Sequence, residues 1–441
     1  MKKIVKILAL VMAFSIFTCV FMACSDDGNT DNNGGNNTST GGNTSTGEGS
    51  KYTLVVWGAQ EDQAMLKEMC NAYAAANPQN TYKFLFGVQS ESDAADKVLN
   101  DLTSGPDVFS FASDQINKLV TAGALARLGG NILEEVKSIN SAESVDAATV
   151  KINGEDMTYA YPSTGDNCYF LYYDKSKLNL DDVATLDGIL AKAASLNKKV
   201  HYKLNEDGWY LSSFFFSNPN LKYDVTYDAN MTETAVSLNY NNAEGLEVMK
   251  ALRSYLSNGA LVANTDDAKL LNAVANGEAI AAVSGTWNAK AIQAAWGDNM
   301  GVIKLPTATI GGQQKQLTSY FGYKLMGVNN MSKNKGEAHK LAMWLTNQQN
   351  QLLRFQTRGF GPTNKVVADM DIVKNDLVMS AVFSQQQYSR TQKGVPGAYW
   401  TPMSSLVTSI ITSLQNGEEV TDATLQESLD ALVDAVNKTA E

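Results

Sequence analysis

Several β-rich runs of the sequence are followed directly by aromatic or oxygen-bearing side chains. Trp57 ends one run, Phe111 and Asp114 end a second, residues 164–167 a third, and Trp287 follows a fourth. Flat aromatic faces pack against the apolar C–H face of a pyranose ring, while carboxylate and carboxamide oxygens accept hydroxyl protons. Side chains of these two kinds, gathered in one place, predict a carbohydrate site.

The elements before these positions alternate between strands and helices. Residues 51–58, 81–87 and 106–112 have the β-branched and aromatic content of buried strands, and 61–78 and 91–105 have helical spacing. This alternation predicts an α/β fold with parallel strands. Ligands of such sheets bind beyond the carboxyl ends of the strands, so we expect the strand-end residues to meet there.

The same alternation continues to the end of the chain. Further strands are expected within 157–162, 167–174 and 279–285. Helices are expected over 113–128, 181–196, 243–261, 336–359 and 421–441.

The N-terminal residues have the layout of a secretory signal. Residues 1–23 carry three lysines, then a short apolar run, and end on Ala23. The following Cys24 resembles the acylated cysteine of bacterial lipoproteins, and two acyl chains would anchor the protein stably. Residues 24–50 are then a polar Ser/Gly/Asn/Thr tether, expected to be disordered. An ordinary signal that leaves Cys24 as a free thiol is the alternative.

The composition excludes several classes of protein. The net charge of −11 argues against nucleic acid as a partner, because phosphate backbones require clustered Lys and Arg. The two histidines lie outside any Cys/His/Asp cluster, so we expect no metal and no cofactor. Cys70 and Cys168 are too few for a disulfide framework and are expected to be buried thiols, although pairing between them stays open.

Five motifs, in this order, resemble family 1 extracellular solute-binding proteins of sugar ABC transporters, and among them the maltose/maltodextrin-binding proteins. They are LVVWGAQED (54–62), GPDVFSFASD (105–114), YAYPSTGDNCYFLYYDKSKL (159–178), NGEAIAAVSGTWNAKAI (276–292) and RGFGPTNKVV (358–367). The resemblance implies a type II periplasmic-binding-protein-like α/β fold with a hinge between two lobes. It places lobe 1 in 51–164 plus 306–360 and lobe 2 in 165–305 plus 361–441.

The resemblance also implies which residues contact the sugar. Gln115 stands where the family usually has an arginine, and the register does not decide between Asp166 and Asn167. Trp57 and Phe111 have strand patterns that fit the core equally well, and Asp114 fits a helix cap. The predicted substrate-binding residues are Trp57, Glu61, Asp62, Phe111, Asp114, Gln115, Asp166, Asn167, Trp209, Tyr210, Trp287, Tyr399 and Trp400.

The function implied is capture of maltose or malto-oligosaccharides by a monomer outside the cell, held at the membrane by lipidated Cys24. The protein would deliver the sugar to the transmembrane subunits of an ABC permease. The same fold could instead bind another oligosaccharide or another solute. A surface glycoside hydrolase is a remote alternative, since it needs paired carboxylates and no hydrolase motif is present. We therefore expect a binding protein and not an enzyme.

Overall fold

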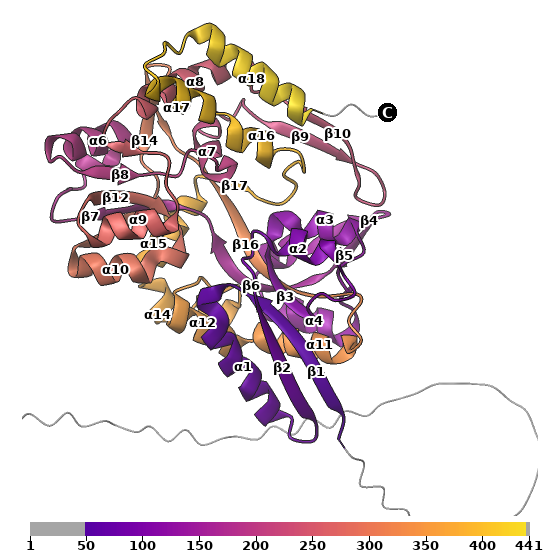
Figure 1. Cartoon of the computed structure of the whole chain (residues 1–441). Coiled ribbons are helices and arrows are strands. Elements are labelled where there is room, and N and C mark those ends of the chain that lie inside the picture. The colour runs from indigo at the N-terminus through magenta and orange to yellow at the C-terminus, as the bar shows by residue number, and fades with distance from the viewer. Residues whose placement is uncertain (1–48, 438–441) are drawn as a thin grey trace, which may run out of the picture. The chain divides into compact units, whose positions relative to one another are not determined.

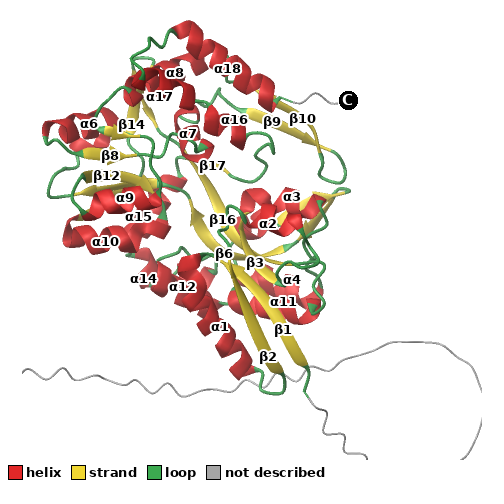
Figure 2. Cartoon of the chain, in the orientation of Figure 1, coloured by secondary structure: helices red, strands yellow, loops and turns green. Residues whose placement is uncertain are grey.

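Two separate β-sheets, each covered by helices, organise the chain (Figures 1 and 2). The computed structural model describes residues 49–437, which belong to one unit that begins at Gly49. The predicted signal peptide, Cys24 and nearly all of the predicted tether lie outside the described residues. Within 49–437, no helix combines the length and the apolar character needed to span a membrane.

The first sheet contains the N-terminal strands. β1 is parallel to β2 and β3, as the alternating pattern predicted, while β16 runs antiparallel to β3 and β6. The order is β17-β16-β3-β1-β2, with β6 paired to β16. The strands are β1 (Lys51–Gly58), β2 (Thr81–Val88), β3 (Val108–Ala112), β6 (Ala160–Asn167), β16 (Ser319–Val328) and β17 (Ser389–Thr391).

Alternation along β1 shows how the sequence builds this sheet. Leu54 and Val56 are fully buried on one face, where they share a core with Met65 and Met69 of helix α1. Trp57 points to the opposite face and packs against a second core that contains Phe109. Because successive side chains of a strand point to opposite faces, both faces of β1 are covered and the strand reads as continuously apolar.

The second sheet has the order β11-β8-β12-β7-β13. Its β7 and β13 are antiparallel neighbours, and β8 is parallel to β11 and β12. Its strands are β7 (Phe170–Asp174), β8 (Lys199–His201), β11 (Leu261–Val262), β12 (Ala279–Ser284) and β13 (Met300–Ile303). The remaining strands form two-stranded pairs: β4 (Thr149–Ile152) with β5 (Glu155–Thr158), β9 (Tyr223–Tyr227) with β10 (Glu233–Leu238), and β14 (Thr307–Ile310) with β15 (Gln313–Gln316).

Helices follow most strands in both halves. The α-helices are α1 (Gln63–Ala76), α2 (Ala94–Asn100), α3 (Ile116–Thr121), α4 (Gly130–Ile139), α5 (Ala142–Ala147), α6 (Leu186–Ser195), α7 (Gly208–Phe215), α8 (Ala243–Leu256), α9 (Asp267–Ala275), α10 (Ala289–Trp296), α11 (Lys335–Leu345), α12 (Gln348–Arg358), α13 (Lys365–Ala368), α14 (Asp371–Lys374), α15 (Leu377–Gln386), α16 (Trp400–Ser405), α17 (Thr408–Gln415) and α18 (Asp422–Val436).

Several predicted helices are shorter than expected, among them those over 91–105 and 243–261, which are α2 and α8. The single helix predicted over 336–359 is two helices, α11 and α12. The Asn347 side chain caps α12 by accepting a hydrogen bond from the backbone N–H of Asn350, 2.9 Å away. The helix predicted over 113–128 ends at Thr121, because Gly123 takes the left-handed conformation that stops helices.

The polypeptide passes between the two sheets next to a pair of bonded strands. β6 lies in the first sheet and β7 in the second, and only Cys168 and Tyr169 separate them. β6 is hydrogen-bonded along β16, and the register of this pair shifts on both sides of Lys324. Such interruptions are β-bulges, which bend a strand and redirect its side chains.

Candidate functional site

Trp209 and Trp287 lie side by side in the half of the molecule built on the second sheet. Trp209 is held by helix α7, whose first backbone N–H groups are capped by Asp207 Oδ1 at 3.0 and 3.2 Å. Trp287 follows strand β12. The two ring centroids are 5.9 Å apart with the planes at 41°, and both indoles are half-buried. They form a broad aromatic surface at the end of β12.

Helix α16 carries the third tryptophan, Trp400, close to α7. A Cβ atom on Gly208 would lie 3.1 Å from the Trp400 carbonyl oxygen and 2.9 Å from Met403 Cβ, so glycine permits this close approach. The Gly208 N–H donates to Ser404 Oγ at 2.9 Å. These contacts hold α16 against the first turn of α7, the turn that carries Trp209.

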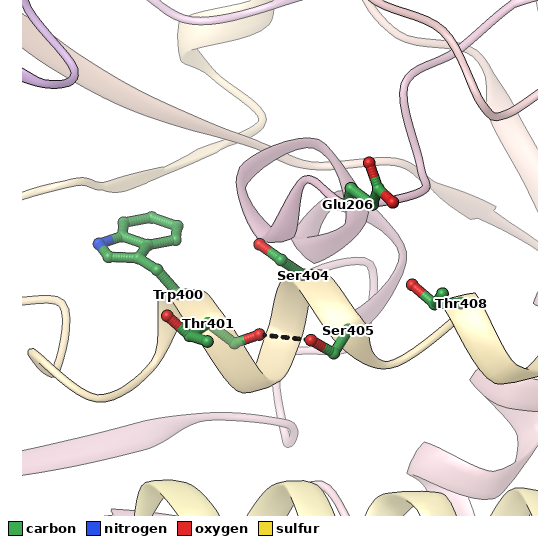
Figure 3. A pocket seen from close by; sticks show the side chains of 6 residues that line it. All are labelled: Glu206, Trp400, Thr401, Ser404, Ser405 and Thr408. Carbon is green, nitrogen blue, oxygen red and sulfur yellow. Dashed lines mark hydrogen bonds between the residues drawn. The ribbon is translucent and has the colours of Figure 1, made fainter.

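A cavity of about 390 Å³ opens on the surface of α16 (Figure 3). One aromatic side chain, one carboxylate and four hydroxyl groups surround it, which is the combination predicted for a sugar site. Its lining residues are Glu206, Trp400, Thr401, Ser404, Ser405 and Thr408. Glu206 is exposed and has φ of +58°, a strained conformation that clusters at functional sites.

Sequence reasoning included Trp400 but missed the other lining residues. Glu206 sits in the polar loop NEDGWY, next to the predicted pair Trp209 and Tyr210, and this position was the available signal. The hydroxyls of α16 and α17 give no such signal, because isolated serines and threonines are common on helix surfaces.

Three aromatic residues predicted to contact ligand lie in the protein core instead. Phe111 is fully buried with Phe109, because alternation along β3 directs both rings to the same face. Tyr399 is fully buried and its hydroxyl bonds with Ser212 Oγ at 2.8 Å. Tyr210 is also buried, against Tyr169. These three rings therefore offer no exposed face to a ligand in this structure.

Among the predicted residues at the end of β1 and in the loop after it, one is buried and two keep exposed atoms. Asp62 is buried and accepts a hydrogen bond from Arg358 Nε at 2.8 Å, so this carboxylate is engaged in an ion pair. Glu61 is exposed, and Trp57 is half-buried against Gly87 of β2. Of these residues, Glu61 and Trp57 keep exposed atoms that a ligand could reach.

Asp114 lies in a chain of side-chain hydrogen bonds that sequence reasoning did not foresee. Gln392, which directly follows β17, donates from Nε2 to Asp114 Oδ1 at 2.9 Å and accepts from Asn167 Nδ2 at 2.9 Å. Burial raises the pKa of Asp114 to about 6, although the bond from Gln392 opposes this shift. The structure therefore connects Asp114 and Asn167 through one carboxamide.

Gln115 and Asp166 hold the backbone in place. The Gln115 amide donates to the carbonyl oxygens of Glu91 and Ser92 at 3.1 and 2.6 Å, and accepts from Ala95 N–H at 3.1 Å. Asp166 is fully buried and accepts from Thr286 Oγ1 at 2.7 Å and from the N–H of residue 361 at 2.9 Å. The Gln115 amide is used by these backbone groups, whereas Asp166 Oδ1 has no hydrogen-bond partner among residues 49–437. Asp166 and Asn167 both stay candidates for ligand contact.

Among residues 49–437, no three His, Cys, Asp or Glu side chains lie so that they could hold a metal ion together. Cys70 and Cys168 are both free and buried, as predicted. Burial raises the pKa of the Cys70 thiol to about 12, and it also raises the pKa of Cys168 well above the ordinary value.

The fold and the two-part distribution of these residues agree with the comparisons to known proteins. The sequence profile of the family described as bacterial extracellular solute-binding protein matches residues 68–381. This chain belongs to that family. The family consists of solute-binding proteins and not enzymes, which confirms the prediction of a non-catalytic role.

Individual relatives have names that refer to oligosaccharides. A galactooligosaccharide-binding protein of Bacillus subtilis (strain 168) is 25% identical over 84% of this chain and 87% of its own length. A maltotriose-binding protein of Pyrococcus abyssi is 22% identical over 81% of this chain and 77% of its own. A structure solved with acarbose is 31% identical, with a TM-score of 0.76 over 88% of this chain and 99% of that one.

Solved structures also establish the architecture. A maltodextrin-binding protein of L. casei BL23 superimposes with a TM-score of 0.70 at 23% identity, over 88% of this chain and 99% of that one. This likeness confirms the predicted two-lobe α/β fold.

Proposed function

We propose that the protein binds maltose or malto-oligosaccharides. The observation that carries this proposal is the aromatic surface of Trp209 and Trp287. The cavity lined by Trp400, Glu206 and hydroxyl groups supports it, since Trp400 packs on the same hydrophobic core as the other two tryptophans. The indole faces would pack on pyranose rings, and Asp114 and Glu206 would accept hydroxyl protons. A volume of about 390 Å³ lies in the range of small-molecule sites.

Binding from both lobes explains how such a site works. Sugar that contacts residues of both halves stabilises the arrangement in which the halves approach each other, because only that arrangement makes both sets of contacts. Asp114 belongs to the half built on the first sheet and Trp287 to the other. The ligand would therefore shift the population toward the closed form.

We further propose that the bound sugar is handed to the transmembrane subunits of an ABC permease. Acylated Cys24 would hold the protein at the outer face of the membrane, and the tether would keep its local concentration near the permease high. Membership of an extracellular solute-binding family supports this location.

A galacto-oligosaccharide is the second candidate ligand, because the B. subtilis relative is named for one. Aromatic faces and hydroxyl acceptors suit both sugars, and the linkage would be distinguished by how the rings lie on the three indoles.

Isothermal titration calorimetry with maltose, maltotetraose, galactobiose, cellobiose and xylobiose tests the proposal. Binding of the α-1,4-glucans with weaker or no binding of the others is the expected result. Preference for galactobiose would favour the second candidate, and no heat with any of the five would refute carbohydrate binding.

A further inference from the structure

Lys324 is a buried cation between the two halves of the molecule. Its side chain is 11% exposed and extends from β16 at the interruption of the β6–β16 pair. Its Nζ lies 4.2 Å from the Phe360 ring centroid and 5.9 Å from the ring centroid of Trp287. A lysine of the first sheet thus lies over a tryptophan of the second, at the aromatic surface of the proposed site.

The ammonium group has no close hydrogen-bond acceptor. Its ion-pair partner, Glu91 Oε2, is 3.8 Å away, which is too long for a hydrogen bond. No other side-chain or backbone acceptor within residues 49–437 bonds to Nζ. An ammonium carries three donors, so Nζ keeps donors that a bound hydroxyl could satisfy.

Neighbouring cations differ from Lys324 in this respect. Arg358 donates to Asp62 at 2.8 Å, and Arg354 donates to the Leu345 carbonyl oxygen at 3.2 Å. Glu91 itself is held by other residues. Its carbonyl oxygen accepts a hydrogen bond from the Gln115 amide, and its carboxylate accepts one from Ser110 Oγ at 3.5 Å. The loop that carries Glu91 is therefore fixed, and the open donors belong to Lys324.

The space next to Lys324 is small and polar. A cavity of about 10 Å³, room for roughly one water molecule, lies beside its side chain. Besides Lys324, its lining includes the charged side chains of Asp62, Glu91 and Arg354 and the hydroxyl groups of Ser110 and Ser163.

We propose that Lys324 is a specificity-determining residue that donates a charged hydrogen bond to a hydroxyl of the sugar packed on Trp287. This inference rests on the proposed carbohydrate-binding function and names the donor that complements the acceptors Asp114 and Glu206. The ammonium would select sugars that present a hydroxyl at the edge of that indole, since a ligand without it leaves the ammonium donors without an acceptor.

Calorimetry of the full chain with maltotriose tests the role of Lys324. Lys324→Met keeps the length of the side chain and removes the charge, and it is expected to weaken binding roughly 10- to 100-fold. Lys324→Arg should restore most of the affinity. Lys304→Met is the matched control, because Lys304 also lies over an aromatic ring, Tyr388, at 4.9 Å, and it should bind like the wild type.

Removing Lys324 alone leaves Glu91 unpaired and could unfold the protein. The double variant Glu91→Gln/Lys324→Met removes both charges, and thermal unfolding measures whether it folds. Expected is a folded protein with the same loss of affinity. Wild-type affinity in this folded variant, or in Lys324→Met, would overturn the inference and leave carbohydrate binding intact. Absence of binding by the wild type would overturn both.

Discussion

Replacing Asp166 with alanine is expected to destabilise the protein, because this carboxylate ties three segments together. Its Oδ2 accepts from Thr286 Oγ1 at 2.7 Å and from the N–H of residue 361 at 2.9 Å, and the residue is fully buried. Each hydrogen bond to a charged acceptor contributes about 1.5–3 kcal/mol. The two bonds together stabilise the fold by about 3–6 kcal/mol.

Two further features affect the net loss of unfolding free energy in Asp166→Ala. Oδ1 of Asp166 has no hydrogen-bond partner in the described part of the chain, so its removal offsets some of the loss. Burial lowers the pKa of the nearby Arg354. The negative charges of Asp62, Glu91 and Asp166 raise that pKa and so partly oppose the effect of burial. We therefore expect a net loss near the lower bound, about 3 kcal/mol.

Calorimetric or dichroism melts measure this loss. About 2.1 cal/mol/K per residue over roughly 390 residues gives an unfolding entropy near 0.8 kcal/mol/K, so 3 kcal/mol lowers Tm by about 4 °C. Asp166→Asn keeps an acceptor oxygen and should lose about half as much. Asp96→Ala is the control, since Asp96 forms only an exposed ion pair with Lys118 and should change Tm by less than about 1 °C.

A Tm of Asp166→Ala within about 1 °C of the wild type would refute this reasoning. It would show that the hydrogen bonds are replaced by water or by movement of Thr286. A normal Tm combined with lost sugar binding would instead identify Asp166 as a ligand contact, as the sequence had suggested.

Three other outcomes are expected. Trp287→Ala should weaken maltotriose binding by about 2 kcal/mol, roughly 30-fold, in calorimetry, and unchanged affinity would remove Trp287 from the site. Asp114 has a raised pKa of about 6, so its carboxylate is ionised above that pH and protonated below it. The affinity for maltotriose should therefore fall roughly tenfold between pH 7.5 and 5, because the protonated group is the weaker acceptor. Asp114→Asn should abolish this pH dependence. Cys70 and Cys168 should not react with a thiol reagent in the native protein at pH 8 and should react after unfolding, because both thiols are buried with raised pKa values; rapid native labelling would contradict their burial.

The architecture could be predicted from the sequence because periodicity and chain order are local signals. The run 51–58 and the helix after it appear as expected, since their apolar spacing matches one buried face each. The antiparallel course of β16 could not be predicted, because nothing in residues 319–328 specifies which strand lies beside it. Such long-range pairing depends on the whole sheet.

The sequence predicted the kinds of residue in the candidate site, but it did not predict every residue that lies there. Trp209, Trp287 and Trp400 keep exposed surface, as their polar or strand-end surroundings indicated. The sequence left open whether Phe111 is core or ligand contact, because a strand buried on both faces has no alternation that marks an exposed ring; the structure places the ring in the core. Gln392 and Lys324 were missed because their roles arise from contacts with residues more than 200 positions away or from a bulge in the backbone.

The bonded pair β6–β16 limits how the two halves can move. A ladder of hydrogen bonds resists sliding of one strand along the other, whereas it yields to bending where its register is broken. Both breaks flank Lys324, so bending of this pair of strands is expected to centre on this residue. Lys324 also faces Trp287. The position of its side chain over the indole would therefore change with the degree of closure of the two lobes.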